Sequence, residues 1–190
     1  PGYRHFSSPV SNTTVADLAT GSFSPVVNPA YNTAPVPNNV TPFPTVFGYN
    51  EQRVTTSGNP APQDFDKGFF SPASTADPMV VTRGYTVNIP AGLTPDFVGT
   101  LNNGTINASG LTRGTQTESG WQLLGNPYPA PINWDSVGRS NVDAAVYVYR
   151  STGQYAGTYS AYVANGAGTN GGSNAIGSGQ GFFVRVSTPG

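Results

Sequence analysis

The single histidine and the carboxylates are the residues of this chain that could carry acid–base chemistry. His5 is the only histidine, and Ser7 and Ser8 follow it closely. A serine hydrolase needs a serine, a histidine and an acid together, often with a G-x-S-x-G turn, which this sequence lacks. The nine acids stand mostly in turn contexts such as Asp77-Pro78, where aspartate closes the turn with its own side chain. We expect no catalytic residues and no enzyme, with a hydrolase domain as the remote alternative.

Metal ligands are scarce in the sequence. One histidine and no cysteine cannot supply a closed zinc shell. Asp64, Asp66 and neighbouring carbonyl groups could hold a calcium ion, although the further acids and the terminal glutamate of an EF-hand loop are missing. We expect no cofactor and no metal site, and a loop calcium stays open as an alternative.

Aromatic side chains in the second half of the chain could stack on sugar rings. An apolar face with a polar rim is what such recognition needs. The other interpretation is that these rings are buried at strand edges, with the tyrosine hydroxyl groups in water. The candidate sugar-stacking residues are Trp134, Tyr155, Tyr159 and Tyr162.

The charge content of the chain excludes several partners. Only 9% of the residues are charged, the net charge is -1, and the basic residues are scattered, so no basic stripe could neutralise a run of phosphates. No apolar stretch approaches the roughly 20 residues of a membrane helix. We therefore expect neither nucleic-acid binding nor direct membrane insertion.

Turn residues and aromatic residues together predict short strands. The chain has 24 glycines and 18 prolines, while aromatic residues make up 12%, too many for a disordered chain. Strand-like runs lie at 79–82, 85–89, 121–124, 145–150 and 182–186. Residues 164–179 are nearly all small or polar and predict a surface loop in which only Ile176 is buried.

Three sequence anchors recur in the same order in the two halves. Residues 2–10 match 120–128, residues 46–50 match 146–150, and residues 83–87 match 180–184. Both copies of the first anchor are followed by a turn-rich stretch, 11–18 and 130–137, in which we expect a short helical turn. His5 corresponds to Leu123, so replacing His5 by Leu is expected to leave the fold and any binding activity intact.

The expected fold is a single all-β module over residues 1–190, a sandwich or barrel-like domain with one or two short helical turns. It consists of two diverged pseudo-repeats, at about 1–89 and about 120–190, joined by a connecting segment at about 90–119 with one or two strands. Alternation along the strands places six residues in or beside the core. These are Trp121, Leu123, Tyr128, Val146, Val148 and Phe183.

At these anchors the sequence resembles a β module of secreted and cell-surface proteins of Bacteroidota, many of them exported by the type IX secretion system. The matching segments are GYRHFSSPVS, YNEQR, RGYTVNI, GWQLLGNPYPAPINWDS, YVYR and SGQGFFVRV. The resemblance covers nearly the whole chain and implies an all-β module of a multidomain extracellular protein, without established catalytic residues. It gives a structural role to the residues that carry the specific block, namely Asn126, Pro127, Tyr128, Pro129, Trp134 and Asp135.

The resemblance also bears on modification and function. Asp135-Ser136-Val137 is similar to the O-glycosylation motif of Bacteroidota, so Ser136 is a candidate site that should be exposed. We expect a structural or adhesive module at the cell surface, part of a fibre or multidomain array. Its partners would be other copies, neighbouring domains of the same protein or glycans. A carbohydrate-binding module is the alternative.

Overall fold

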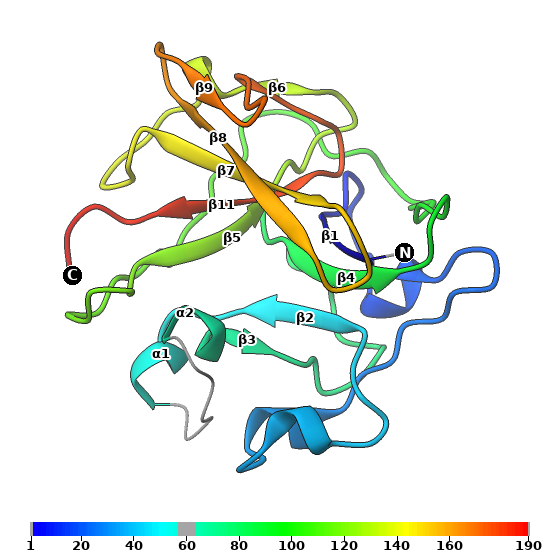
Figure 1. Ribbon diagram of the computed structural model, residues 1–190. Helices are drawn as coiled ribbons and strands as arrows, with labels where there is room; N and C mark the ends of the chain where they lie inside the picture. Colours follow the sequence, from blue (N-terminus) through cyan, green and yellow to red (C-terminus); the bar gives the residue numbers. More distant parts are fainter. Residues whose placement is uncertain (1, 57–63, 190) are drawn as a thin grey trace.

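The computed structural model describes residues 2–56 and 64–189, which form two antiparallel sheets (Figure 1). The first sheet contains, in spatial order, β1 (Gly2–Phe6), β4 (Tyr85–Ile89), β2 (Val46–Tyr49) and β3 (Phe69–Phe70). The second contains β5 (Trp121–Gly125), β11 (Gly181–Arg185), β7 (Ala145–Ser151), β8 (Gly157–Val163) and β9 (Gly168–Thr169). β6 (Ile132–Asn133) and β10 (Ala175–Ile176) form a separate two-stranded ladder. The expected all-β, sandwich-like fold is confirmed.

Three neighbouring strands of the first sheet, β1, β4 and β2, have counterparts in the second sheet, namely β5, β11 and β7. β4 lies between β1 and β2, as β11 lies between β5 and β7. The pairing register repeats as well, because His5 lies opposite Thr86 and its counterpart Leu123 lies opposite Phe183. β2 and β7 contact the central strands at matching positions, so these two strands are equivalent, as their sequences predict.

Two equivalent backbone hydrogen bonds join the halves. In one the first half donates and the second accepts, and in the other the second half donates and the first accepts. The N–H of Ser7 donates to the carbonyl oxygen of Gly179, and the N–H of Gly125 donates to that of Thr82. Ser7 and Gly125 are counterparts, and both acceptor residues have a positive φ, 66° for Gly179 and 73° for Thr82. Repetition with exchanged roles is what a twofold relation between the halves produces.

Three hydrophobic clusters follow from the alternation along the strands. One cluster, which includes Val46 and Val87, packs on the first sheet, and a second, which includes Val146 and Val184, packs on the second sheet. The third, centred on Phe183, lies on the opposite faces, where the two sheets meet. Among the residues expected in or beside the core, Leu123, Val146 and Phe183 are buried, whereas Trp121, Tyr128 and Val148 are half-buried.

Short helical turns connect the strands. The two expected turns are η1 (Val15–Leu18) and η4 (Trp134–Ser136), one in each half. The described residues also contain η2 (Pro29–Asn32), η3 (Pro37–Asn39), α1 (Arg53–Thr56) and α2 (Asp64–Lys67). A proline begins η2 and η3, where its fixed φ favours the helical conformation. No helix in residues 2–56 and 64–189 is long and apolar enough to cross a membrane.

The long connections differ from expectation in two places. Residues 79–82 form no strand, and residues 81 and 82 lie in a turn. Segment 90–119 contains no strand beyond the single bridge of Leu101 to Val10. Segment 112–120 is instead held by bonds to a side chain, because Glu51 accepts from the backbone N–H groups of Gly114 and Gly120. In segment 164–179 only Ile176 is buried, as predicted.

Candidate functional site

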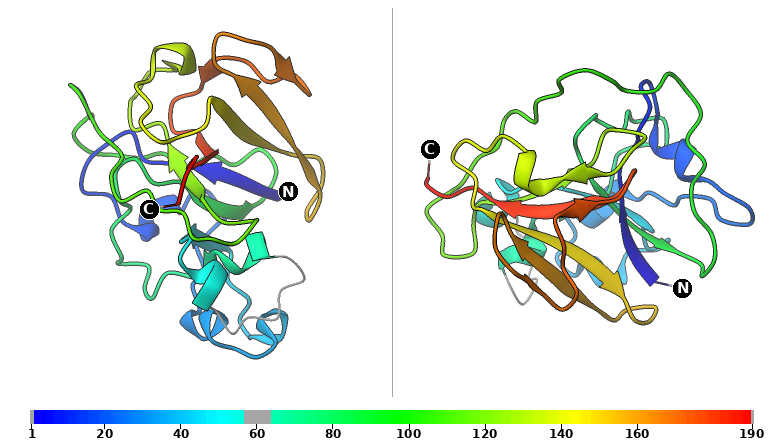
Figure 2. Two further views of the ribbon diagram at one scale, coloured as in Figure 1. Left: turned by 90° about the vertical axis from the view of Figure 1, so that its left-hand side faces the viewer. Right: turned by 90° about the horizontal axis from the view of Figure 1, so that it is seen from above.

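The space between the two sheets is filled by aromatic rings that gather around Phe183. This side chain is 1% exposed. Its ring centroid lies 5.0 Å from that of Tyr49, 5.2 Å from that of Phe65 and 5.5 Å from that of His5, all of which belong to the first half. Figures 1 and 2 show how this comes about, since β2, β3 and α2 lie on one side of β11 and the β7–β8 hairpin lies on the other.

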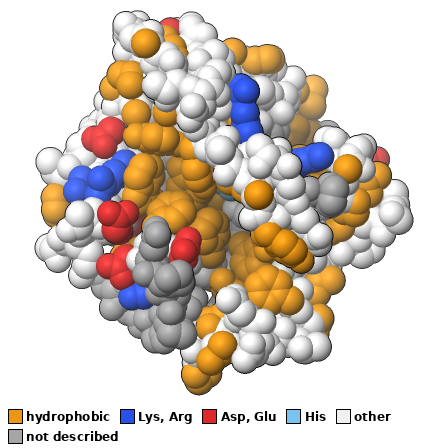
Figure 3. Space-filling model, in the orientation of Figure 1, with side chains coloured by type: hydrophobic (Ala, Val, Ile, Leu, Met, Phe, Trp, Pro, Cys, Tyr) orange, Lys and Arg blue, Asp and Glu red, His pale blue; other side chains and the backbone are white. Residues whose placement is uncertain are grey.

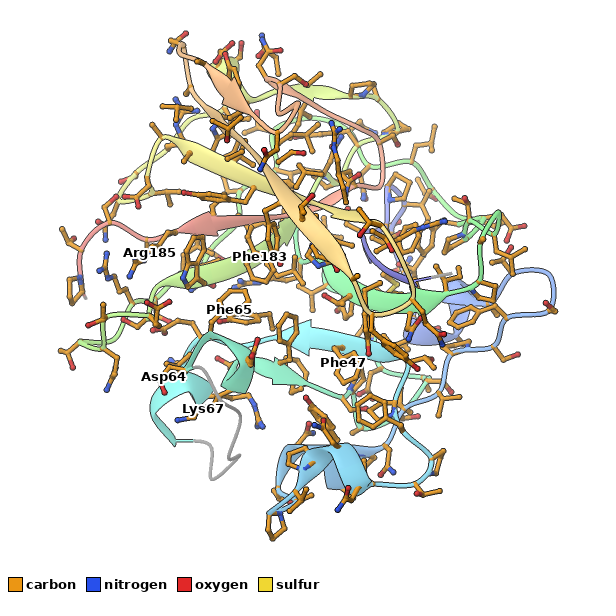
Figure 4. The ribbon with its side chains drawn as sticks, in the orientation of Figure 1. Phe47, Asp64, Phe65, Lys67, Phe183 and Arg185 are labelled. Carbon is orange, nitrogen blue, oxygen red and sulfur yellow. The ribbon has the colours of Figure 1, made fainter. Side chains whose placement is uncertain are left out.

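Two adjoining cavities open beside this cluster, with volumes of about 390 Å³ and about 310 Å³. They share Phe65 and Tyr159, and we call them together the aromatic cleft. Figure 3 shows it as a hollow floored by hydrophobic side chains, with charged side chains along one side. In Figure 4, Arg185, Asp64 and Lys67 lie at one end of this region and Phe47 lies toward the other.

The aromatic cleft is built from alternate residues of strands in both halves. β1 presents Tyr3 and His5, β7 presents Tyr147 and Tyr149, and β8 presents Tyr159. Because side chains two positions apart share one face of a strand, β1 and β7 each turn two rings toward the other sheet. The short helix α2 adds Phe65 and Asp66 from a third direction, and residues 31 to 47 add further rings.

The polar groups of the aromatic cleft are mostly neutral hydroxyl groups. Burial raises the pKa of Tyr3, Tyr31, Tyr149 and Tyr159 above the ordinary value of a phenol. These hydroxyl groups therefore keep their protons at neutral pH and can both donate and accept hydrogen bonds. Burial also raises the pKa of Asp66, the one carboxyl group that lines the larger cavity.

The four aromatic residues predicted to form a sugar platform do not lie together. Trp134 is 2% exposed, and its indole N–H donates to the carbonyl oxygen of Ala144 at 2.8 Å, so it is a core residue and the prediction for it is wrong. Tyr155 is 75% exposed in the turn between β7 and β8. Tyr162 lies on the opposite face of β8 from Tyr159, and only Tyr159 reaches the aromatic cleft.

The residues of the predicted modification motif take different positions. Ser136 is exposed in η4. Asp135 accepts hydrogen bonds from the backbone N–H of Asn165 at 2.7 Å, from the side-chain amide of Asn174 at 2.8 Å and from the Tyr162 hydroxyl at 3.0 Å. These bonds hold the pKa of the Asp135 carboxyl below its usual range. Asp135 therefore ties the 164–179 loop to η4.

The acidic residues mostly serve the fold. Glu51 is 3% exposed and binds the connecting segment through three donors. Asp64, one of the two candidate ligands for the alternative of a loop calcium, forms an ion pair with Lys67 at 2.8 Å. Within the described residues no group of three or more histidine, cysteine or acidic side chains could hold a metal ion. Asp66 and Glu118 line the aromatic cleft, one in each cavity.

Most residues of the aromatic cleft were not identified from sequence. They come from eight strands, three short helices and the intervening loops of both halves, and no local spacing joins them. One signal was available: Tyr3 and His5, and likewise Tyr147 and Tyr149, alternate with residues on the opposite strand face, so an aromatic second face was visible in the pattern.

The strand edges are short or partly covered. β3 and β9 each have two residues. Phe6, the last residue of β1, bridges to Gln180, and Leu124, the residue before the last of β5, bridges to Arg83. Short and covered edges are the usual protection against pairing between chains.

Comparisons with known proteins give one match. A family model described as a domain of unknown function (DUF8693) matches residues 2–190. No curated protein and no solved structure matches this chain.

Proposed function

The chain belongs to the DUF8693 family, and we propose that it is a non-catalytic adhesive module of an extracellular protein that binds a carbohydrate in the aromatic cleft. The observation that carries this proposal is the cleft itself, a hollow between the sheets lined by aromatic rings and by tyrosine hydroxyl groups. Its cavities fall in the range of volumes in which proteins hold small ligands.

The chemistry of the lining favours a sugar over a purely apolar ligand. A sugar ring offers an apolar C–H face, which packs on aromatic rings, and a rim of hydroxyl groups, which need hydrogen-bond partners. The hydroxyl groups of Tyr3, Tyr31, Tyr149 and Tyr159 and the carboxyl group of Asp66 supply such partners. An apolar ligand would offer these polar groups no hydrogen bonds in exchange for the water that it displaces, at a cost in affinity.

The extracellular location is proposed from the sequence. It is supported by the resemblance of the anchors to secreted modules of Bacteroidota, and the low charge content agrees with that composition. A module of a longer surface protein that binds glycans would act as an adhesin. A non-catalytic role is supported by the use of Glu51, Asp64 and Asp135 in holding loops and turns.

Carbohydrate binding ranks ahead of self-association through strand edges. Of the four edge strands, β3 and β9 have two residues each, which is too short for an extended intermolecular ladder. The five-residue edge strands β1 and β5 are each bridged to the opposite half near one end. Large exposed apolar side chains such as Val98 and Val80 come from separate loops, and neither lies in an edge strand. Light scattering of the purified module at high concentration would support a fibre role only if it detected multimers.

The proposal is tested by titration calorimetry with three neutral probes, cellohexaose, xylohexaose and mannohexaose. At least one of the three probes should bind. Tyr159→Ala should weaken the affinity of the protein for that probe by roughly tenfold, which corresponds to the loss of about 1.4 kcal/mol expected for one aromatic contact. Val98→Ala is the control, since Val98 is exposed and does not line the aromatic cleft. Its affinity should stay unchanged.

Two results would contradict the proposal. One is that none of the three probes binds. The other is a hydrolytic activity on any of them that disappears in Asp66→Asn, which would make the aromatic cleft an active site.

A further inference from the structure

One buried pair of residues at the aromatic cleft breaks the match between the two halves. In the second half, Leu123 and Phe183 face each other across β5 and β11, and each is 1% exposed. At the equivalent position of the first half stand His5, 4% exposed, and Thr86, 6% exposed. The fold accepts a wholly apolar pair here, as the second half shows, so packing alone does not explain the polar one.

Both polar side chains carry a buried atom without a partner. Nδ1 of His5 and Oγ1 of Thr86 are inaccessible to solvent and make no hydrogen bond within the described part of the chain. Buried polar atoms are normally bonded, because desolvation without a replacement bond is costly. Both residues line the larger cavity of the aromatic cleft.

The imidazole ring has a fixed place in this lining. It stacks on Tyr149, with ring centroids 5.4 Å apart and planes inclined by 20°, and it meets Phe183 edge-on. A neutral imidazole offers one donor and one acceptor nitrogen, and a threonine hydroxyl can do either. The matching ligand group is another hydroxyl group, which also donates and accepts.

We infer that His5 and Thr86 form a polar floor of the aromatic cleft that binds a hydroxyl group of the sugar. This inference rests on the proposed function and names the residues that would distinguish a polyhydroxyl ligand from an apolar one of the same shape. Both atoms are inaccessible to solvent, so a sugar hydroxyl group reaches them only when a neighbouring side chain, such as the Tyr149 ring that stacks on His5, moves aside. A role of His5 in the polar floor predicts that His5→Leu weakens binding, which is the opposite of the expectation from the sequence repeat.

The experiment compares Thr86→Val and His5→Leu with a matched control. Each variant removes an unpartnered polar atom and keeps a side chain of similar size, so the thermal midpoint should stay equal or rise by a few degrees. Affinity for whichever of cellohexaose, xylohexaose and mannohexaose binds should fall about tenfold or more. Thr13→Val is the control, because Oγ1 of Thr13 is also buried without a partner but Thr13 does not line the aromatic cleft. It should bind as the wild type does.

The outcomes separate the floor from the proposed function. Unchanged affinity in both variants, with a wild type that binds, overturns the floor alone. If the wild type binds none of the three probes, the proposed function fails and the floor is judged by the imidazole ¹⁵N shifts in rising glycerol concentration. His5 is the only histidine, so its two imidazole nitrogens need only be distinguished from each other. A glycerol-dependent shift of Nδ1 that is lost in Thr86→Val supports the floor, and unmoved shifts overturn it.

Discussion

His5 is a buried histidine whose charge state differs between the folded and unfolded chain. Burial lowers the pKa of His5 to about 3, against an ordinary value of 6.5. Between these two values only the unfolded chain takes up the proton, which stabilises the unfolded state. Above pH 6.5 His5 is neutral in both states and does not lower the free energy of unfolding. As the pH falls from 6.5 toward 3, protonation of the unfolded chain lowers the free energy of unfolding progressively.

The pH dependence of stability tests this assignment. From pH 6 down to pH 4, His5 should lower the free energy of unfolding by up to about 1.4 kcal/mol per pH unit. Urea unfolding of the wild type and of His5→Leu at pH 4, 5, 6 and 7 should show a flatter profile for the variant. The comparison isolates His5, because carboxyl groups such as Asp135 are present in both proteins. Parallel profiles would mean that the imidazole is solvated.

Among the elements, the strand-free connecting segment depends on one carboxylate. Glu51, the second residue after β2, accepts from the N–H of Gly114 at 2.7 Å, from the N–H of Gly120 at 3.2 Å and from the hydroxyl of Thr112 at 3.0 Å. It is buried, so no water replaces it easily. A side chain of the first half thereby fixes the segment that leads into β5 of the second.

Glu51→Ala should loosen this segment while leaving the sheets folded. Because buried donors lose their acceptor, the free energy of unfolding should fall by about 1–3 kcal/mol. Amide hydrogen exchange followed by NMR should be faster at Gly114 and Gly120 than in the wild type, with β4 and β11 unchanged. Uniform acceleration along the whole chain would show instead that Glu51 supports global stability.

For the whole molecule, the aromatic cluster makes one cooperative unit out of two repeats. Phe183 belongs to the second half, yet its ring contacts Tyr49, Phe65 and His5 of the first half as well as Trp121 of its own. Neither half can bury its inner face without the other. We therefore expect the two halves to fold and unfold together.

Phe183→Ala should destabilise the protein by about 3–5 kcal/mol, the usual cost of emptying a buried aromatic site. Because the contacts join both halves, urea unfolding followed by near-ultraviolet and by far-ultraviolet circular dichroism should give coincident transitions in both proteins. Two separated transitions would indicate halves that unfold independently.

The sequence predicted the repeated strands because their evidence is local. Alternation and the Gly-led anchors mark β1, β4, β5, β7 and β11 without reference to distant residues. Segment 90–119 could not be predicted in the same way, since side chains far along the chain hold it. Trp134 shows the same limit: its aromatic type made it a candidate for sugar stacking, whereas its packing against Phe182 and its hydrogen bond to Ala144 depend on the tertiary structure.

The aromatic cleft could be predicted only in part for a similar reason. Tyr159 was identified as a candidate, but its partners Phe65 and Tyr3 lie more than ninety positions away in the chain. The twofold relation of the halves brings these residues together. That relation depends on backbone hydrogen bonds between the halves, which the residue types alone do not predict.

The crossing of Ser7 and Gly125 has a consequence for the lineage of this chain. A Cβ atom on Gly125 would overlap the Cβ of Ser7, so a chain with serine at both counterpart positions could not close in this form. Two first halves would collide there, while one first half and one second half fit. If the module arose by duplication of a self-pairing ancestor, this difference excludes a pair of first halves, whereas a second half, with glycine at this position, would meet no such clash with either kind of half.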